Sequence, residues 1–162
     1  MISHQLPLDA ADIRITSHLQ ANARASNAEL AETVHLSPSQ CHRRVKRLEE
    51  LGVIAGYHAE LDRHALGLGI FAFVQISLAT HAKNPTKAFE DAIADFPQIL
   101  ECYSLTGDTD YLMRVAVPDL DAFSEFLMEH IIPLPMVGSV KSSIVLDEVR
   151  HGSGLPLHHL TP

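Results

Sequence analysis

The chain has 162 residues, of which 46% are hydrophobic and 20% are charged, and its 20 acidic side chains outnumber its 12 basic ones to give a net charge of −8. That balance excludes a generic basic nucleic-acid binder, and the apolar content excludes a disordered chain. The two cysteines, Cys41 and Cys102, match no metal or disulfide spacing, and no segment resembles a signal peptide or a membrane span. We therefore expect a globular protein of one or two domains in the reducing cytoplasm, with no membrane partner.

Three short helices are predicted in the first half of the chain. Apolar residues recur at helical spacing over 8–19, which indicates a first helix. A Ser-x-x-Glu capping box at 26–29 begins a second helix. A Ser-Pro start signal at 37–38 begins a third helix, which ends before Gly52. The short connection between the second and third helices predicts a helix-turn-helix.

The third helix has a local charge of +4, because 37–48 holds four basic side chains and no acid. Helical spacing places Cys41, Val45 and Leu48 on the buried face, so polar and basic residues cover the opposite face. A DNA recognition helix needs this display, since it reads bases while its cations hold phosphates. The residues that we predict to contact DNA are Ser37, Ser39, Gln40, His42, Arg43, Arg44, Lys46 and Arg47. Arg44 lies nearer the buried edge, and we expect it to bind a carboxylate or the DNA backbone and not to read bases.

An extended segment is predicted after the third helix. Apolar residues alternate loosely with small or polar ones over 53–61, as in a strand that would form the wing and the exit from the domain. The stretch 62–69 contains two glycines and little periodicity, and the domain boundary is placed there. We expect a DNA-binding domain over 1–62 and a linker over 63–69.

The second half alternates strands and helices. The predicted strands span 70–78, 99–105, 111–117 and 140–149. Helices are predicted to begin after Asn84 and Asp119, each of which is a favourable N-cap residue. The order β-α-β-β-α-β is that of a ferredoxin-like α/β sandwich, expected over 70–152 with a tail over 153–162. The predicted fold class is α+β, with an N-terminal winged helix-turn-helix followed by this domain.

The predicted sheet has one face without a cover. Two helices cover only one face of a four-stranded sheet, which leaves Phe71 and Phe73 on an apolar open face. A second copy of the chain would bury that face. Paired helix-turn-helix units also read two DNA half-sites about one helical turn apart. Both halves of the sequence therefore predict a homodimer.

Five short motifs follow one another along the chain. They are Asn27-Ala28-Glu29-Leu30-Ala31, Leu36-Ser37-Pro38-Ser39, Arg43-Arg44-Val45-Lys46-Arg47-Leu48-Glu49, Gly52-Val53-Ile54 with Gly56-Tyr57, and Gly107-Asp108-Thr109-Asp110-Tyr111-Leu112. In this arrangement the chain resembles the Lrp/AsnC (feast/famine) family of transcriptional regulators from about residue 8 to residue 157. The resemblance implies a winged helix-turn-helix that binds a double-stranded DNA operator and a C-terminal amino-acid-sensing domain. It also implies dimers that often assemble into octamers and control by a free amino acid. From the residues themselves we expect no cofactor and no metal.

In that family the effector lies between sensing domains, beside the loop that matches Leu105–Asp110. Backbone N–H groups around Gly107 could bind the carboxylate of an amino acid, and Asp108 or Asp110 its ammonium group. The alternative is a Gly-Asp turn that only closes a hairpin. The effector-binding residues implied by the resemblance are Leu105, Thr106, Gly107, Asp108, Thr109, Asp110, Ile132, Leu134, Ser142 and Ser143. The ending 154–160 resembles members that respond to leucine or methionine.

Other classes of function stay open on the residues alone. A small ferredoxin-like enzyme is one, although Cys102 has no recognisable base and Asp108 with Asp110 has no nucleophile or metal beside it. An amino-acid-binding regulatory subunit that does not bind DNA is another. The 11 histidines suggest a metal site, but no pair has the spacing of a ligand motif. The function we expect is a sequence-specific transcriptional regulator that is modulated by an amino acid and is not an enzyme.

Overall fold

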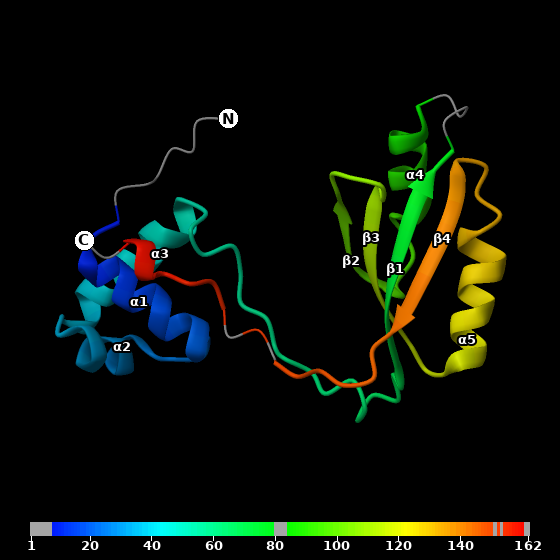
Figure 1. Cartoon of the computed structure of the whole chain (residues 1–162). Coiled ribbons are helices and arrows are strands. Elements are labelled where there is room, and N and C mark those ends of the chain that lie inside the picture. The colour runs from blue at the N-terminus through cyan, green and yellow to red at the C-terminus, as the bar shows by residue number, and fades with distance from the viewer. Residues whose placement is uncertain (1–7, 80–83, 151, 153, 161–162) are drawn as a thin grey trace. The chain divides into compact units, whose positions relative to one another are not determined.

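The computed structural model describes residues 8–79, 84–150, 152 and 154–160; the first seven and last two residues, which the expected domains include, lie outside it. The chain forms two compact units, Met1–Glu60 with Arg150–Pro162 and Leu61–Val149 (Figure 1). The chain thus returns to the first unit after it completes the second. Within the described residues, no helix is long and apolar enough to cross a membrane.

Three helices build the first unit: α1 (Ala10–Ala21), α2 (Asn27–Val34) and α3 (Pro38–Glu50). Helices α2 and α3 begin at the predicted positions, because the capping box at Ser26 and the Ser-Pro start at Ser37 are both formed. Gly52 follows α3 with φ 70°, in the left-handed region that a glycine adopts without strain. The predicted helix-turn-helix is confirmed.

The three helices share a small apolar core. Its most deeply buried side chains are Ile15 of α1, Leu30 and Val34 of α2, and Cys41 and Leu48 of α3. Full burial of one aliphatic side chain of this size contributes about 1.5–3 kcal/mol. This packing fixes which face of α3 is buried, and the opposite face of α3 therefore lies at the surface.

The segment after α3 differs from the prediction, because no strand is present over 53–61. Val53 and Ile54 pack against the helical core, and their backbone N–H groups donate to Leu48 O at 2.9 and 3.2 Å. A strand requires a hydrogen-bonded neighbour, and the described part of this unit offers none. The extended sequence pattern is therefore satisfied by packing on the helices.

The C-terminal tail is held to α1 at two points. Leu155 N donates to Gln20 Oε1 at 2.6 Å, and Gln20 Nε2 donates to Leu155 O at 3.2 Å. Gly154 has φ 91°, and a Cβ there would lie 2.6 Å from Gln20 Oε1. A residue with a side chain would therefore be strained and would also clash with Gln20. A short 3-10 helix, η2 (His158–Leu160), follows.

The second unit contains a four-stranded antiparallel sheet in the order β2-β3-β1-β4. The strands are β1 (Ile70–Leu78), β2 (Ile99–Ser104), β3 (Tyr111–Val117) and β4 (Val137–Ile144). Helix α4 (Pro85–Ile93) follows β1, and α5 (Leu120–Glu125) follows β3. The predicted order β-α-β-β-α-β is confirmed. One core joins the sheet to both helices, with Val74 and Met113 of the strands buried against Phe89 and Phe123.

The helical segment after β3 differs from the single regular helix that the sequence predicts. It continues from α5 as a π-helix, η1 (Phe126–Ile131), and Ile132 N donates to Leu127 O at 2.8 Å, a five-residue spacing. Within this helical segment Phe126 is buried, whereas Leu120 is 58% exposed. The hydrophobic pattern therefore locates this segment but not its hydrogen bonding.

Two smaller expectations about this unit are also corrected. Asn84 precedes α4 as predicted, but it has φ 50° and its side chain caps no backbone group. β4 begins and ends earlier than the predicted 140–149, since its register is set by pairing with β1 up to the pair Ala72 and Ile144. Val145 N still donates to Phe71 O of β1 at 2.8 Å, and residues 146–149 lie outside any strand.

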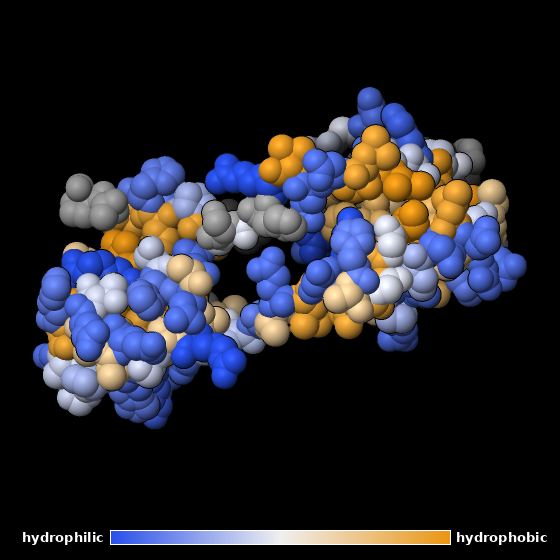
Figure 2. All heavy atoms as spheres, turned by 90° about the horizontal axis from the view of Figure 1, so that it is seen from below, coloured by the Kyte–Doolittle hydropathy of each residue, from blue (hydrophilic) through white to orange (hydrophobic). Residues whose placement is uncertain are grey.

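The face of the sheet opposite the helices is partly apolar. Phe71 and Phe73 meet edge to face with ring centroids 6.2 Å apart, and Phe73 is 37% exposed. The guanidinium carbons of Arg63 and Arg114 lie 5.6 and 5.4 Å from the centroid of the Phe71 ring, which is cation–π distance. Hydrophobic side chains reach the surface at several places on the unit that holds the sheet (Figure 2).

Candidate DNA-binding and effector-binding sites

The exposed face of α3 displays four of the predicted DNA-contacting side chains. Ser39, His42, Arg43 and Lys46 are all exposed. Lys46 pairs with Glu50, whose Oε1 lies 3.8 Å from Nζ. An exposed pair at this distance is weak, so Lys46 can exchange its partner for a phosphate.

Two of the predicted residues hold the start of α3. Gln40 N donates to Ser37 Oγ at 3.3 Å, and Ser37 N donates to Gln40 Oε1 at 3.0 Å. Ser37 Oγ also lies 3.1 Å from Ser39 Oγ. These contacts fix the N-terminus of α3, whose backbone N–H groups and positive dipole end favour an anion such as phosphate.

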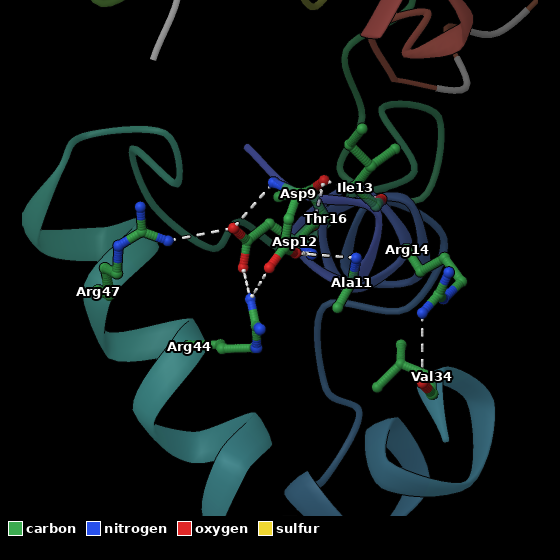
Figure 3. A network of polar contacts seen from close by, with 9 residues as sticks. All are labelled: Asp9, Ala11, Asp12, Ile13, Arg14, Thr16, Val34, Arg44 and Arg47. Atoms are coloured by element: carbon green, nitrogen blue, oxygen red, sulfur yellow. Dashed lines mark hydrogen bonds and ion pairs between the residues drawn. The ribbon is translucent and has the colours of Figure 1, made fainter. Parts of the chain in front are cut away.

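The remaining two predicted residues are bound to acidic residues at the start of α1 (Figure 3). Arg44 Nη1 lies 2.7 Å from Asp12 Oδ1 and 2.8 Å from Asp9 Oδ2, and Arg47 Nη1 lies 3.1 Å from Asp12 Oδ2. Arg44 therefore binds carboxylates, one of the two outcomes expected for its place near the buried edge. The sequence interpretation missed Asp9 and Asp12, although an Asp-x-x-Asp spacing on one helix matches Arg-x-x-Arg on another.

Burial makes this network more than a surface ion pair. The Asp12 side chain is 1% exposed, and a buried carboxylate is tolerated only with close partners. The backbone N–H of Asp12 donates to Asp9, and together with the guanidinium of Arg44 it holds the pKa of Asp9 below its ordinary value. The same two carboxylates, Asp12 more than Asp9, raise the pKa of Arg44. The network therefore ties α3 to the first turn of α1.

Tyr57 folds back on α3, which the sequence interpretation did not anticipate. Its hydroxyl donates to Glu49 Oε1 at 2.9 Å, and burial together with Glu49 raises the pKa of Tyr57 to about 12. A hollow of about 360 Å³ lies here, with Tyr57, His42 and Lys46 in its wall. Tyr57 is thus a neighbour of the basic face, and only its place in the Gly-Tyr motif gave a signal for it.

The predicted effector loop closes a hairpin between β2 and β3 and also reaches β1. Leu105 N donates to Asp110 O at 2.8 Å, and Asp110 N donates to Ile76 O at 2.9 Å. The carboxylate of Asp110 accepts a hydrogen bond of 2.7 Å from Leu78 N. Asp110 therefore has a structural role at the end of β1. The loop tip is open, since Gly107 has φ 112° and no atom lies within 4 Å of the position that a Cβ would take.

The segment after η1 meets the same end of β1. Ala79 N donates to Met136 O at 2.9 Å, which places the end of β1 beside the residues that precede β4. Two predicted effector residues, the exposed Ile132 and the half-buried Leu134, lie shortly before Met136. The structure therefore brings the loop and the segment that holds Ile132 and Leu134 to one end of the sheet.

Two predicted effector residues lie elsewhere within one chain. Ser142 pairs with Val74 and Ser143 with Phe73 in the sheet. Val74 is four residues from the end of β1, or about 13 Å at the rise of a strand. Ser142 and Ser143 therefore lie apart from Leu105, Thr106, Gly107, Asp108, Thr109 and Asp110 in a single protomer.

A separate hollow of about 510 Å³ lies between α4 and β2, with Glu90, Cys102 and Tyr111 in its wall. Tyr111 Oη donates to Glu90 Oε1 at 2.7 Å, and burial together with Glu90 raises the pKa of Tyr111 to about 12. Burial and Glu90 also raise the pKa of the Cys102 thiol. A raised pKa keeps Cys102 as a thiol, and the thiolate is the reactive form.

Comparison with known proteins agrees with this geometry in both units. The model of the Lrp/AsnC ligand binding domain matches residues 71–155, and that of a winged helix-turn-helix DNA-binding domain matches residues 8–55. The leucine-responsive regulatory proteins of Klebsiella pneumoniae and Escherichia coli (strain K12) are each 38% identical to the chain over 148 residues, which are 91% of this chain and 90% of theirs.

Solved structures give the same result. A transcriptional regulator from Neisseria meningitidis, solved as a complex with L-Met, has a TM-score of 0.92 and 41% identity over 95% of this chain and 99% of that one. An AsnC family transcriptional regulator from Agrobacterium tumefaciens has a TM-score of 0.87 and 33% identity over 94% and 99%. The chain therefore belongs to the Lrp/AsnC family, and it is a DNA-binding transcriptional regulator with an amino-acid-binding domain.

Proposed function

We propose that α3 is the recognition helix and that Ser39, His42, Arg43 and Lys46 form its DNA-contacting face. The observation that carries this proposal is the exposure of these four side chains opposite the buried Cys41 and Leu48. Arg43 makes no ion pair among the described residues, and Lys46 makes only the weak exposed contact with Glu50 at 3.8 Å, so both cations are open to a phosphate. Phosphate contacts give affinity and orientation, and contacts with base edges give specificity.

The experiment that tests this proposal compares single variants at one salt concentration. The DNA probe is a duplex that the wild-type protein selects from a random-sequence pool, and its affinity is read by fluorescence anisotropy. Arg43→Ala and Lys46→Ala are each expected to weaken binding, whereas the control Lys87→Ala, which removes an exposed cation on α4, leaves it unchanged. Equal affinity of all three variants and the wild type contradicts the proposal.

The effector that we propose is a free amino acid with an aliphatic or thioether side chain, such as leucine or methionine. The similar Neisseria meningitidis regulator was solved with L-Met, and similar proteins are named leucine-responsive. The loop tip at Gly107 would bind the carboxylate of the amino acid, and Asp108 with Asp110 its ammonium group. Ile132 and Leu134 would contact its side chain. Ser142 and Ser143 would contribute from a neighbouring protomer, since they lie apart from the loop within one chain.

A homodimer formed through the open face of the sheet is the assembly that we propose, with octamers as the larger form. The exposed Phe73 and its contact with Phe71 support this interface, because apolar patches mark surfaces that bind a partner. The functional division that we propose is 1–62 for DNA binding, 63–69 as linker, 70–152 for sensing and assembly, and 153–162 as tail.

We propose that the protein regulates transcription and does not catalyse a reaction. We also propose that it acts in the cytoplasm, together with its DNA partner. Similar proteins are transcriptional regulators, and burial with Glu90 raises the pKa of the Cys102 thiol, which disfavours the nucleophilic thiolate. Cys41 and Cys102 are both free, which suits a reducing compartment.

A further inference from the structure

Arg47 differs from the other cations of α3 because it is both exposed and tethered. Its side chain is 46% exposed, yet Nη1 lies 3.1 Å from Oδ2 of the buried Asp12. Arg44, one turn away, is only 27% exposed and is bound to two carboxylates. Arg47 is four residues from Arg43, so both side chains lie on neighbouring parts of the helix surface.

Asp12 is itself held in place by several contacts (Figure 3). Its Oδ1 binds Arg44 Nη1 at 2.7 Å, and its Oδ2 accepts a hydrogen bond of 3.3 Å from the backbone N–H of Asp9. The backbone N–H of Asp12 donates in turn to Asp9 Oδ1 at 2.9 Å. The carboxylate is therefore a fixed point on α1, to which Arg47 is bound.

The tether leaves Arg47 able to bind a second acceptor. A guanidinium has five N–H donors, and the contact with Asp12 uses one nitrogen. The remaining donors suit a phosphate, which arginine binds through two parallel hydrogen bonds. A long side chain that is ordered before the DNA arrives loses less conformational entropy on binding than a free one.

We propose that Asp12 is a positioning residue for DNA binding: it holds Arg47 ready to contact a backbone phosphate, while Arg44 serves as its structural counter-ion. The proposal rests on the proposed role of α3 in recognition. A carboxylate near DNA repels it, so by charge alone the loss of Asp12 would strengthen binding. The positioning effect acts in the opposite direction, and the sign of the change in affinity separates the two.

The test is a double-mutant cycle on the full chain with the selected duplex as probe. Asp12→Asn is expected to weaken binding about tenfold, within the range of couplings between side chains in contact. Arg47→Ala removes one phosphate contact, so it lowers the slope of log affinity against log salt by about 0.9. Asp12→Asn is expected to lower the slope equally, and the double variant to bind no more weakly than Arg47→Ala.

Two further variants keep the result interpretable. Asp9→Asn removes the same charge three residues earlier and leaves Asp12 with both arginines, so it is expected to bind DNA as tightly as the wild type or more tightly. Asp12→Glu keeps the charge and moves the carboxylate, so it is expected to lower affinity in the wild-type background and not in Arg47→Ala. Asp12→Glu replaces Asp12→Asn if circular dichroism shows that the latter is unfolded.

Several outcomes overturn the inference. The inference is wrong if Asp12→Asn binds DNA as tightly as the wild type or more tightly. It is also wrong if the losses of affinity in Asp12→Asn and Arg47→Ala are fully additive in the double variant. If Arg43→Ala with Lys46→Ala weakens binding while Asp12→Asn does not, only the role of Asp12 is wrong. If that double variant leaves binding unchanged, the proposed role of α3 is wrong, and the role of Asp12 is wrong with it.

Discussion

Asp110 is predicted to have two separable roles, one in the fold and one in binding the effector. Its carboxylate accepts a hydrogen bond of 2.7 Å from Leu78 N, and a hydrogen bond to a charged group contributes about 1.5–3 kcal/mol. Asp110→Ala removes this acceptor and should lower the free energy of unfolding by that amount. Asp110→Asn keeps an oxygen for Leu78 N and loses only the charge, so its stability should fall by less than about 1 kcal/mol.

Because Asp110→Asn keeps the contact with Leu78 N, an assay of effector binding with this variant tests the charge of Asp110 alone. A ligand at about 100 times its dissociation constant adds about 2.7 kcal/mol, which raises the melting temperature of a domain of 60–100 residues by about 10–20 °C. A thermal-shift screen of the twenty amino acids should find this shift with leucine or methionine. Asp110→Asn and Asp108→Asn, alone or together, should reduce it, since they remove the acceptors proposed for the ammonium group.

Three results would refute this reasoning. One is a screen in which no amino acid shifts the melting temperature of the wild type. Another is a full shift in the variant that carries both Asp108→Asn and Asp110→Asn. A third is a loss of stability in Asp110→Asn as large as that in Asp110→Ala, because the amide would then have failed to keep the contact with Leu78 N.

The remaining predictions concern assembly, the tail and pH. Phe73→Arg should convert a dimer into a monomer in light scattering, because an unpaired cation is costly in an apolar interface; an unchanged mass contradicts the interface. Gly154→Ala should detach the tail from Gln20 and raise the rate of amide hydrogen exchange over 154–160. An unchanged exchange rate would show that the contact between Gln20 and Leu155 does not depend on Gly154. The backbone N–H of Asp12 and the guanidinium of Arg44 lower the pKa of Asp9 from 3.8. The free energy of unfolding should therefore fall as the pH drops below about 4, and it should fall less steeply in Asp9→Asn. An equal pH dependence in the two proteins contradicts this prediction.

Local signals in the sequence were sufficient to predict the helices of the first unit. The capping boxes at Ser26 and Ser37 specify helix starts through contacts within four residues. β1 was likewise predicted at its observed bounds, because nine residues with apolar side chains on both faces indicate a strand. Such features depend on neighbours along the chain and therefore appear in the sequence.

Features that depend on distant residues were not predicted. The partners of Asp12 are 32 and 35 residues away, so the acid appeared only as part of a helix start. The end of β4 depends on its pairing with β1, and the apolar pattern gave no signal for the π-helix over Phe126–Ile131. Of the candidate site, the sequence identified the basic face of α3 and the place of Arg44 near its buried edge, but not the partners Asp9 and Asp12 or the contact of Arg47 with Asp12.

The central claim is that the exposed basic face of α3 binds the DNA backbone and bases. Its most direct test is the salt dependence of affinity for the selected duplex, measured for the wild type, Lys87→Ala and the double variant Arg43→Ala/Lys46→Ala. Two lost phosphate contacts should lower the slope of log affinity against log salt by about 1.8 in the double variant, with no change in Lys87→Ala. A double variant with the slope and affinity of the wild type would contradict the assignment of α3 as the recognition helix.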